Sequence, residues 1–159
     1  MGQNMVGIPQ IKFSGLTPGT KIRFRYAEIL YPELPEYEGK EGTLMLENIR
    51  AAMAQDIYIA KGGEETFKPF FTNHGYRYIE ISGIEELPLD NVEGIVLSSI
   101  KGIDAKYETS SELVNKLWSN ITWSTLGNFV SIPTDCPQRN ERLGWAGDIS
   151  VFSRTASYM

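Results

Sequence analysis

The sequence predicts a mainly β protein whose final third is helical. In the first hundred residues, short apolar segments of strand length alternate with Gly- and Pro-containing turns. After residue 101, the apolar residues recur at the spacing of an α-helix. A chain of 159 residues can build one good core, or one core and a short appendage. Together these observations favour an antiparallel β-sandwich followed by two α-helices.

The first strand pair is predicted from residues 8–13 and 21–30. Residues 21–26 alternate strictly between basic and apolar side chains, as expected for a strand with one buried face. That face carries Ile22, Phe24 and Tyr26. Residues 17–20, Thr-Pro-Gly-Thr, are typical of a turn, so we expect the two segments to form a hairpin.

Five further strands are expected before residue 100. Residues 31–42 contain two prolines and several glutamates, which indicates an exposed loop. Gly-containing segments at residues 61–63 and 73–75 are predicted turns, and His74 lies in the second. The predicted strands are residues 43–48, 56–60, 67–72, 76–82 and 92–99.

Two helices are predicted beyond residue 106. Thr109 and Glu112 have the spacing of a capping box, which predicts a helix over residues 110–126. Its apolar face is formed by Val114, Leu117, Trp118 and Ile121. The second helix is expected to begin near Asp148, which then acts as its N-cap. Its apolar side contains Ile149, Phe152, Ala156 and Met159.

Composition excludes several classes of function. The net charge of -5 and the absence of a basic stripe argue against nucleic-acid binding. No apolar run is long enough to span a bilayer. There is no His and Cys cluster at metal-ligand spacing and no phosphate-binding glycine loop, so we expect neither a metal nor a cofactor. The single cysteine, Cys136, leaves the cellular compartment open.

Residues 135–148 form the most informative segment of the chain. Within fourteen residues they contain three carboxylates, two arginines and one tryptophan, and Pro137, Gly144 and Gly147 interrupt any regular helix or strand. Two carboxyl groups that face each other across a cleft are the minimum requirement for acid/base hydrolysis of a glycosidic bond. A thiol nucleophile at Cys136 is disfavoured because the only histidine, His74, has no evident link to it.

This segment resembles the signature of bacterial α-L-rhamnosidases of glycoside hydrolase family 78. Residues 2–7, Gly-Gln-Asn-Met-Val-Gly, and residues 71–78, Phe-Thr-Asn-His-Gly-Tyr-Arg-Tyr, are similar to the β-sandwich domain that precedes the catalytic barrel in this family. The resemblance implies a lectin-like, jelly-roll sandwich over residues 1–105. Residues 106–159 would then open an (α/α)6 barrel, so the chain is expected to be an internal piece of a longer enzyme.

The resemblance also implies roles for five residues. Glu141 would be the general acid, Asp135 and Asp148 would hold sugar hydroxyls, Trp145 would stack on the sugar ring, and Arg139 is a weaker binding candidate. Structural alternatives stand beside these roles: an ion pair of Glu141 with Arg139 or Arg142, a turn at Asp135, a helix cap at Asp148 and a core position for Trp145.

Two features of the segment bear on the proposed acid. Adjacent arginines lower a carboxyl pKa, whereas a working acid at neutral pH needs a raised one. Asn140 stands where the family commonly has aspartate, which puts any role of that position in doubt. Arg142 is expected to be structural.

The implied activity is the removal of terminal α-L-rhamnose, with inversion, from rhamnose-containing oligosaccharides or plant glycosides. A carboxylate beyond residue 159 would activate water, so the isolated chain is expected to be inactive, and its unpaired barrel helices could self-associate. The alternative is a non-catalytic carbohydrate-binding or scaffolding sandwich with a platform of exposed aromatic side chains, for which the candidates are Tyr31, Tyr37 and Tyr58.

Overall fold

Two antiparallel β-sheets face each other in the computed structural model, which describes residues 1–159. In the first sheet, the long strand β1 (Met5–Leu16) pairs with β4, β5 and β7. In the second sheet, β2 (Lys21–Ala27) lies between β3 and β6. The bounds of the partner strands are β3 Gln55–Ile59, β4 Gly63–Phe67, β5 His74–Tyr76, β6 Tyr78–Ser82 and β7 Val92–Val96.

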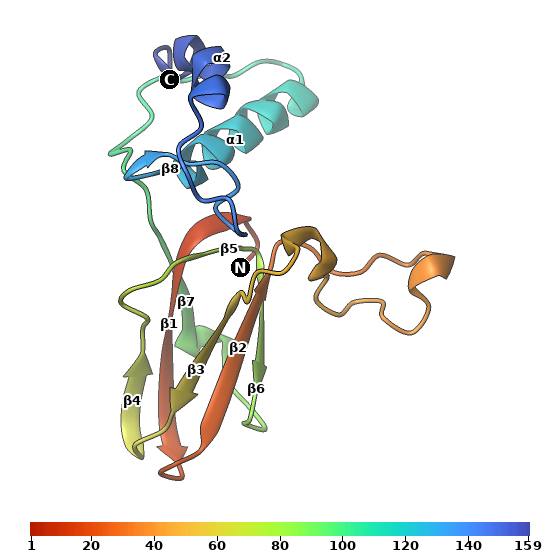
Figure 1. Ribbon diagram of the computed structural model, residues 1–159, viewed down its shortest axis with the longest axis vertical. Coiled ribbons are helices and arrows are strands. Elements are labelled where there is room, and N and C mark those ends of the chain that lie inside the picture. Colours follow the sequence, from red (N-terminus) through yellow and green to blue (C-terminus); the bar gives the residue numbers. More distant parts are fainter.

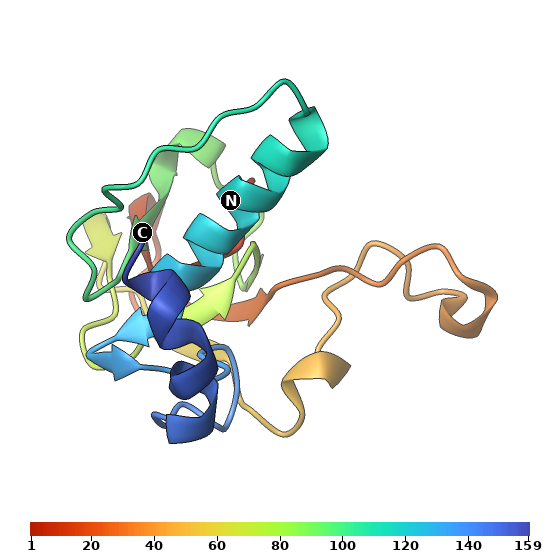
Figure 2. The same ribbon diagram turned by 90° about the horizontal axis from the view of Figure 1, so that it is seen from above.

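The helices lie together beyond one end of the sandwich (Figure 1). Helix α1 (Glu112–Gly127) meets β1 there: a side chain on Gly127 would approach the Val6 side chain to 3.2 Å. A short hairpin, β8 (Phe129–Val130) and β9 (Ile132–Pro133), leads from α1 towards α2 (Ala146–Ala156). Seen from above, residues 31–43 extend away from both layers as a long loop (Figure 2). The predicted arrangement of a sandwich followed by two helices is therefore confirmed.

The hydrophobic core fills the space between the sheets. Ile22, Phe24 and Tyr26 are fully buried, as their alternation with basic residues predicts. Phe24 stacks on Phe67 of the opposite sheet, with the ring centroids 4.4 Å apart. Aromatic pairs of this kind add to the free energy gained by removing apolar area from water. This contact joins the two layers.

The predicted hairpin between the first two strands is wrong. The turn forms, because Thr20 N–H donates to Thr17 O at 3.1 Å, but β1 and β2 belong to different sheets. Each strand has an apolar face that must be buried, and the turn lets these faces meet across the sandwich instead of lying side by side.

Three other predictions for the sandwich are corrected. Residues 43–48 are not a strand; they contain a single bridge from Leu44 to Leu30, and a 3-10 helix, Glu47–Ile49, begins there. The strand expected at residues 67–72 lies earlier in the chain, at β4 (Gly63–Phe67). In this strand Glu65 accepts hydrogen bonds from the backbone N–H groups of Lys61 and Gly62. His74 is a buried residue of β5 and not part of a turn.

Both helices form, but their N-terminal caps differ from the prediction. Thr109 does not cap α1: Asn115 Oδ1 accepts a hydrogen bond from Thr109 N–H at 2.8 Å, and Ser111 is the N-cap without a side-chain bond. Helix α2 begins at Ala146, so Asp148 lies in its first turn and is not its cap. The half-buried residues of α2 and the segment after it are the predicted apolar ones: Ile149, Phe152, Ala156 and Met159. Neither helix combines the length and the apolar character that a membrane crossing requires.

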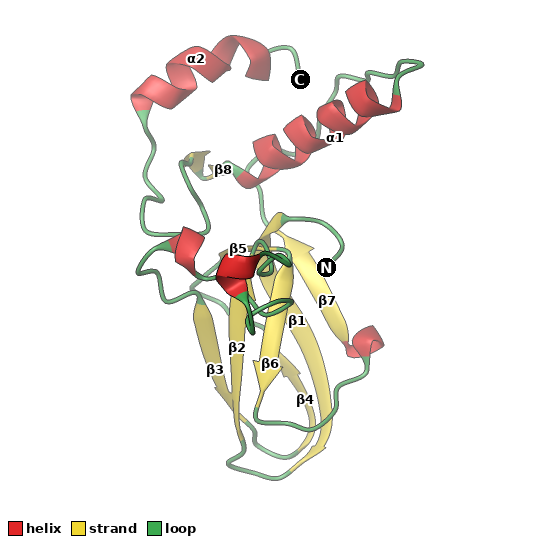
Figure 3. Cartoon of the chain, turned by 90° about the vertical axis from the view of Figure 1, so that its right-hand side faces the viewer, coloured by secondary structure: helices red, strands yellow, loops and turns green.

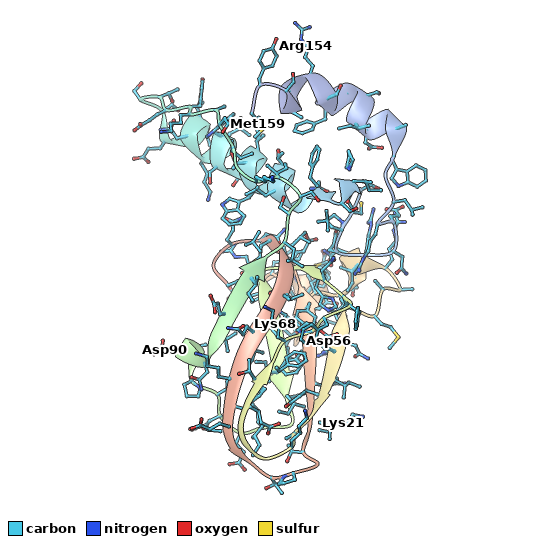
Figure 4. All side chains as sticks on the ribbon, turned by 90° about the vertical axis from the view of Figure 1, so that its left-hand side faces the viewer. Lys21, Asp56, Lys68, Asp90, Arg154 and Met159 are labelled. Atoms are coloured by element: carbon cyan, nitrogen blue, oxygen red, sulfur yellow. The ribbon has the colours of Figure 1, made fainter.

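The views from the two sides place the sandwich and the helices at opposite ends of the molecule. In Figure 3 the strands run away from the helical end, and α1 and α2 lie as separate rods above them. Figure 4 shows Lys21 near the far tip of the sandwich and Arg154 on the outer side of α2, while Asp56 lies within the sandwich. The junction between these two parts is where the candidate site lies.

We predict that Phe24→Ala destabilises the protein by about 3–5 kcal/mol, because it removes a fully buried ring and leaves a cavity between the sheets. Urea denaturation monitored by tryptophan fluorescence measures this loss. The matched control is Phe71→Ala, whose ring is fully exposed and whose loss should change the free energy of unfolding by less than about 0.5 kcal/mol. Similar losses for the two variants would contradict the described core.

Candidate active site

The candidate site is built on an irregular loop, residues 134–145, which joins β9 to α2 and is called the site loop below. The loop closes on itself, since Asp135 N–H donates to Leu143 O at 3.0 Å and Arg139 N–H donates to Cys136 O at 3.3 Å. Cys136 has a positive φ of 41°, which is uncommon for a residue with a side chain. The irregular backbone predicted for this segment is present as far as Trp145, although Gly147 lies inside α2.

The carboxylate of Glu141 is held by two arginines. Arg139 donates to Oε2 from Nη2 at 2.7 Å and from Nε at 3.1 Å, and Arg50 of the sandwich donates to Oε1 from Nη1 at 3.0 Å. The Glu141 side chain is still 30% exposed, so it is not sealed in a core. The predicted alternative of an ion pair with Arg139 is therefore present, whereas Arg142 makes none with Glu141.

The arginines dominate the electrostatics of this carboxylate. Hydrogen bonds from Arg139, then from the Cys136 thiol, lower the pKa of Glu141 below its usual range, and the charges of Arg139 and Arg50 act in the same direction. Partial burial opposes them but is the weaker effect. In this arrangement Glu141 is ionised at neutral pH, so it must lose part of this positive surrounding before it can donate a proton.

Three other predicted residues line one hollow between α1 and α2. Asp135, Trp145 and Asp148 border a space of about 480 Å³, and the rings of Phe129 and Phe152 form part of its apolar wall. The Trp145 side chain is 48% exposed, so it is not a core tryptophan. Arg139 and Glu141 are not among the residues that line this hollow. The structure therefore gathers three of the five predicted residues around the hollow and holds the other two together beside it.

The local structure explains where Asp148 and Asp135 lie. Asp148 lies in the first turn of α2, where the helix dipole favours a negative charge. Asp135 is the second residue of the site loop, with its N–H bonded to Leu143 O, and it borders the hollow. Trp145 is the N-cap residue of α2, and its carbonyl oxygen accepts a hydrogen bond from Ile149 N–H at 3.3 Å, so the site loop ends where the helix begins.

One group of side chains has donor atoms suited to a cation. Oxygen or sulfur atoms of Asp135, Cys136 and Glu141 all lie within 4.8 Å of one another. Arg139 Nη2, however, already donates to both Cys136 Sγ, at 3.1 Å, and Glu141 Oε2. Because the guanidinium supplies positive charge to this group, we assign Cys136 and Glu141 to an arginine-centred network, with Asp135 next to it, and not to a metal site.

The same network argues against a thiol nucleophile. Burial, followed by the neighbouring carboxylates of Asp135 and Glu141, raises the pKa of the Cys136 thiol, whereas a nucleophilic cysteine needs a lowered one. The only histidine, His74, belongs to a different network in the sandwich, where its Nε2 lies 3.0 Å from Asp56 Oδ2.

The site loop is seated on β5 at a point where the sequence has no side chain. A Cβ atom on Gly75 would lie 2.6 Å from Gln138 Cβ and 3.0 Å from Gln138 Cα, far closer than packed carbon atoms approach. Only glycine therefore fits between β5 and the loop. Sequence reasoning missed this contact and interpreted Gly75 as part of a turn; a glycine within a strand can instead mark a close approach of two backbones.

A buried polar network holds β5 in place behind this contact. Tyr26 OH donates to Asp56 Oδ2 at 2.8 Å, and the His74 ring stacks on the Tyr26 ring with the centroids 3.9 Å apart. Burial alone would raise the pKa of Asp56, but the hydrogen bonds from His74 and Tyr26 outweigh it and lower that pKa. The position of the site loop therefore depends on packing inside the sandwich.

The three candidate tyrosines are half-buried and do not form a common platform on the sandwich. The Tyr58 ring stacks on Phe13 in the core, with the centroids 5.9 Å apart, and its hydroxyl donates to Glu65. Tyr31 and Tyr37 pack against each other in the projecting loop, with their centroids 5.0 Å apart. The three tyrosines that are candidates for the alternative function are thus engaged with one another or with the core.

The two parts of the chain match two family models. Residues 1–98 match the model of the bacterial α-L-rhamnosidase concanavalin-like domain. Residues 104–159 match the model of the bacterial α-L-rhamnosidase 6 hairpin glycosidase domain. The chain belongs to the bacterial α-L-rhamnosidase family.

Individual relatives agree with this assignment. The chain is 47% identical over 160 residues to an α-L-rhamnosidase of Streptomyces avermitilis, an alignment that covers 99% of this chain and 15% of that protein. It is 42% identical to an α-L-rhamnosidase of Formosa agariphila, over 98% of this chain and 16% of the relative.

Solved structures give the same result. The α-L-rhamnosidase from Dictyoglumus thermophilum superposes with a TM-score of 0.89 at 42% identity, and the enzyme from Aspergillus terreus with 0.87 at 41%. These alignments cover 99% and 98% of this chain, and 17% of each relative. The chain therefore spans less than a fifth of the length of the proteins it matches.

We predict that Gly75→Ala destabilises the protein by about 1–3 kcal/mol, because the added methyl group overlaps Gln138 and must push the site loop away from β5. Urea denaturation measures the loss, and amide chemical shifts of residues 135–143 locate the displacement. Gly102→Ala is the matched control, since a Cβ there meets no atom within 4 Å. Unchanged loop shifts in Gly75→Ala would contradict the described contact.

Proposed function

We propose that this chain is part of a glycoside hydrolase that removes terminal α-L-rhamnose from rhamnose-containing oligosaccharides or plant glycosides. Membership of the α-L-rhamnosidase family supports this substrate class, and so do the names of the relatives. Residues 1–105 would serve as the sandwich domain, and residues 106–159 would supply the first hairpin of the catalytic barrel. The observation that carries the proposal is a carboxylate loop, braced by the sandwich, beside a hollow lined by two aspartates and an exposed indole.

Glu141 is the general acid in this proposal and protonates the departing glycosidic oxygen. Its carboxylate meets one requirement of that role because it is partly exposed. The second requirement is that the acid carries a proton at the working pH. Glu141 does not meet it while both guanidinium groups bind the carboxylate, since they favour its ionised form. When Arg50 turns away, Oε1 is free to carry a proton, while the Arg139 bonds to Oε2 still favour the ionised form.

The sugar itself would be held at the hollow. The exposed face of Trp145 suits the apolar side of a rhamnose ring and its methyl group, and Asp135 and Asp148 can accept hydrogen bonds from hydroxyls. Arg139 remains a weaker candidate for binding, since its guanidinium is already shared between Glu141 and Cys136.

The reaction is proposed to invert the anomeric carbon. An inverting glycosidase needs a second carboxylate about 6.5–9.5 Å from the acid to activate a water molecule. We assign that base to a part of the enzyme outside these 159 residues. General acid catalysis contributes about 10²–10⁴ in rate, and only when substrate is bound and oriented. Alone, the chain should therefore not turn over substrate.

We predict that a chimaeric enzyme, in which this chain replaces its aligned 160 residues in the Streptomyces avermitilis relative, hydrolyses nitrophenyl α-L-rhamnoside. Glu141→Gln in the chimaera should lower kcat by about 10²–10⁴ because the departing oxygen loses its proton donor. Glu86→Gln, an exposed change of the same type in the sandwich, is the control and should leave kcat unchanged.

Two results would contradict the proposal. Full activity of the Glu141→Gln chimaera would remove Glu141 from the acid role. Activity of the isolated 159-residue chain above its own Glu141→Gln variant would show that the proposed division of catalytic groups is wrong.

We further predict that the isolated chain self-associates through its helices. Leu113 is 80% exposed and Val151 is 83% exposed, so they leave apolar surface uncovered. Replacing both with glutamine should weaken self-association by roughly tenfold, equivalent to about 1.4 kcal/mol. Sedimentation equilibrium measures this change, with Lys116→Gln on the same helix as the control. A chain that is monomeric at every concentration would contradict the prediction.

A further inference from the structure

Arg50 connects the sandwich to the candidate acid from a point 91 residues earlier in the chain. It follows the 3-10 helix Glu47–Ile49, and this segment lies at the end of the sandwich that faces the helices (Figure 1). Its Nη1 lies 3.0 Å from Glu141 Oε1. No feature of the local sequence around residue 50 indicates this role, because the partner is brought near only by the fold.

The backbone at Arg50 is held in an unusual conformation. Its φ of 56° and ψ of -129° lie outside the regions that residues with side chains commonly adopt. Ile49, directly before it, is 98% buried and fixes the segment to the core. Strained residues that persist on a rigid support often occur at functional sites, so this conformation calls for a functional explanation.

The two arginines on Glu141 are not equivalent. The Arg139 side chain is 21% exposed, donates twice to Oε2 and also contacts Cys136, all within the site loop. The Arg50 side chain is 61% exposed, donates only to Oε1 and comes from the sandwich. Arg50 is therefore the partner that can leave without disturbing the loop, and Oε1 is the oxygen that its departure frees.

We propose that Arg50 is a positioning residue for Glu141, supplied by the sandwich domain, which orients the carboxyl group and holds Oε1 until substrate displaces the guanidinium. The inference rests on the proposed acid role of Glu141 and extends it to a residue outside the helical domain. It also gives the sandwich a part in catalysis beyond support.

The charged and titratable groups that face this carboxylate are few. Arg139 and Cys136 face it from the site loop, Asp135 lies in the same group of donor atoms, and Arg50 faces it from the sandwich. Because Arg50 favours the ionised form, its removal should raise the pKa of Glu141, while the larger effects of Arg139 and Cys136 keep most of the lowering.

The first test uses the 159-residue chain and does not depend on activity. Carbon-13 NMR titration follows the side-chain carboxyl of Glu141, identified by its absence in Glu141→Gln. We expect Arg50→Gln to move the titration midpoint to higher pH and Arg50→Lys to keep most of the wild-type midpoint, because lysine retains the charge. Arg23→Gln, the loss of an exposed arginine on β2, should leave it unchanged. An unchanged midpoint in Arg50→Gln would overturn the inference.

The second test uses the active chimaera and its pH profile. For Arg50→Gln we expect kcat/KM at the optimum to fall by roughly tenfold, because the carboxyl group is no longer oriented when substrate enters, and kcat to change by less than about twofold, because the guanidinium has already left the carboxyl group in the bound complex. The alkaline limb of kcat/KM, which reports the pKa of the acid in the free enzyme, should move to higher pH, and Arg50→Lys should reverse both changes in part. A wild-type rate and profile for Arg50→Gln would overturn the positioning role.

The two tests separate this inference from the proposed function. If Glu141→Gln retains activity in the chimaera, the acid role of Glu141 fails, and the NMR titration still decides whether Arg50 holds the carboxylate. If Glu141→Gln is inactive and Arg50→Gln behaves as wild type in both tests, the proposed function stands and the role of Arg50 is wrong.

Discussion

The close approach of Gly75 to Gln138 is the constraint on which the candidate site depends. Because β5 has no side chain at this point, the site loop can lie directly on the end of the sandwich. The buried contacts among Tyr26, Asp56 and His74 fix β5 behind it. This seating brings Arg50 within reach of Glu141, and it sets the loop beside the hollow between the helices. Packing contacts within the sandwich thus determine where the site loop lies relative to the two helices.

The electrostatics of the site follow from that seating. A carboxylate bound by two guanidinium groups is stable as an anion, whereas a general acid must carry a proton at the working pH. In our proposal the exposed Arg50 of the sandwich relieves part of this conflict, because it holds the carboxylate in the resting state and releases one oxygen when substrate arrives. In this proposal a charged neighbour orients the carboxyl group of the acid as well as lowering its pKa.

The sequence was a good guide to the main architecture. Alternation in residues 21–26 identified the buried side of β2, and helical spacing identified the apolar side of α2, because each pattern depends only on the element itself. The sequence failed where contacts between distant segments decide the structure. The sheet to which β2 belongs, the burial of His74 and the pairing of Arg50 with Glu141 all depend on which surfaces meet after folding.

The seating of the site loop can be tested most directly on the unmodified chain in solution. Nuclear Overhauser spectroscopy reports pairs of protons that lie within about 5 Å of each other. We predict strong cross-peaks between the α-protons of Gly75 and the β-protons of Gln138, comparable to those between the rings of Phe24 and Phe67. If the ring cross-peaks are present and those between Gly75 and Gln138 are absent, the sandwich does not hold the loop and the account of the site is wrong.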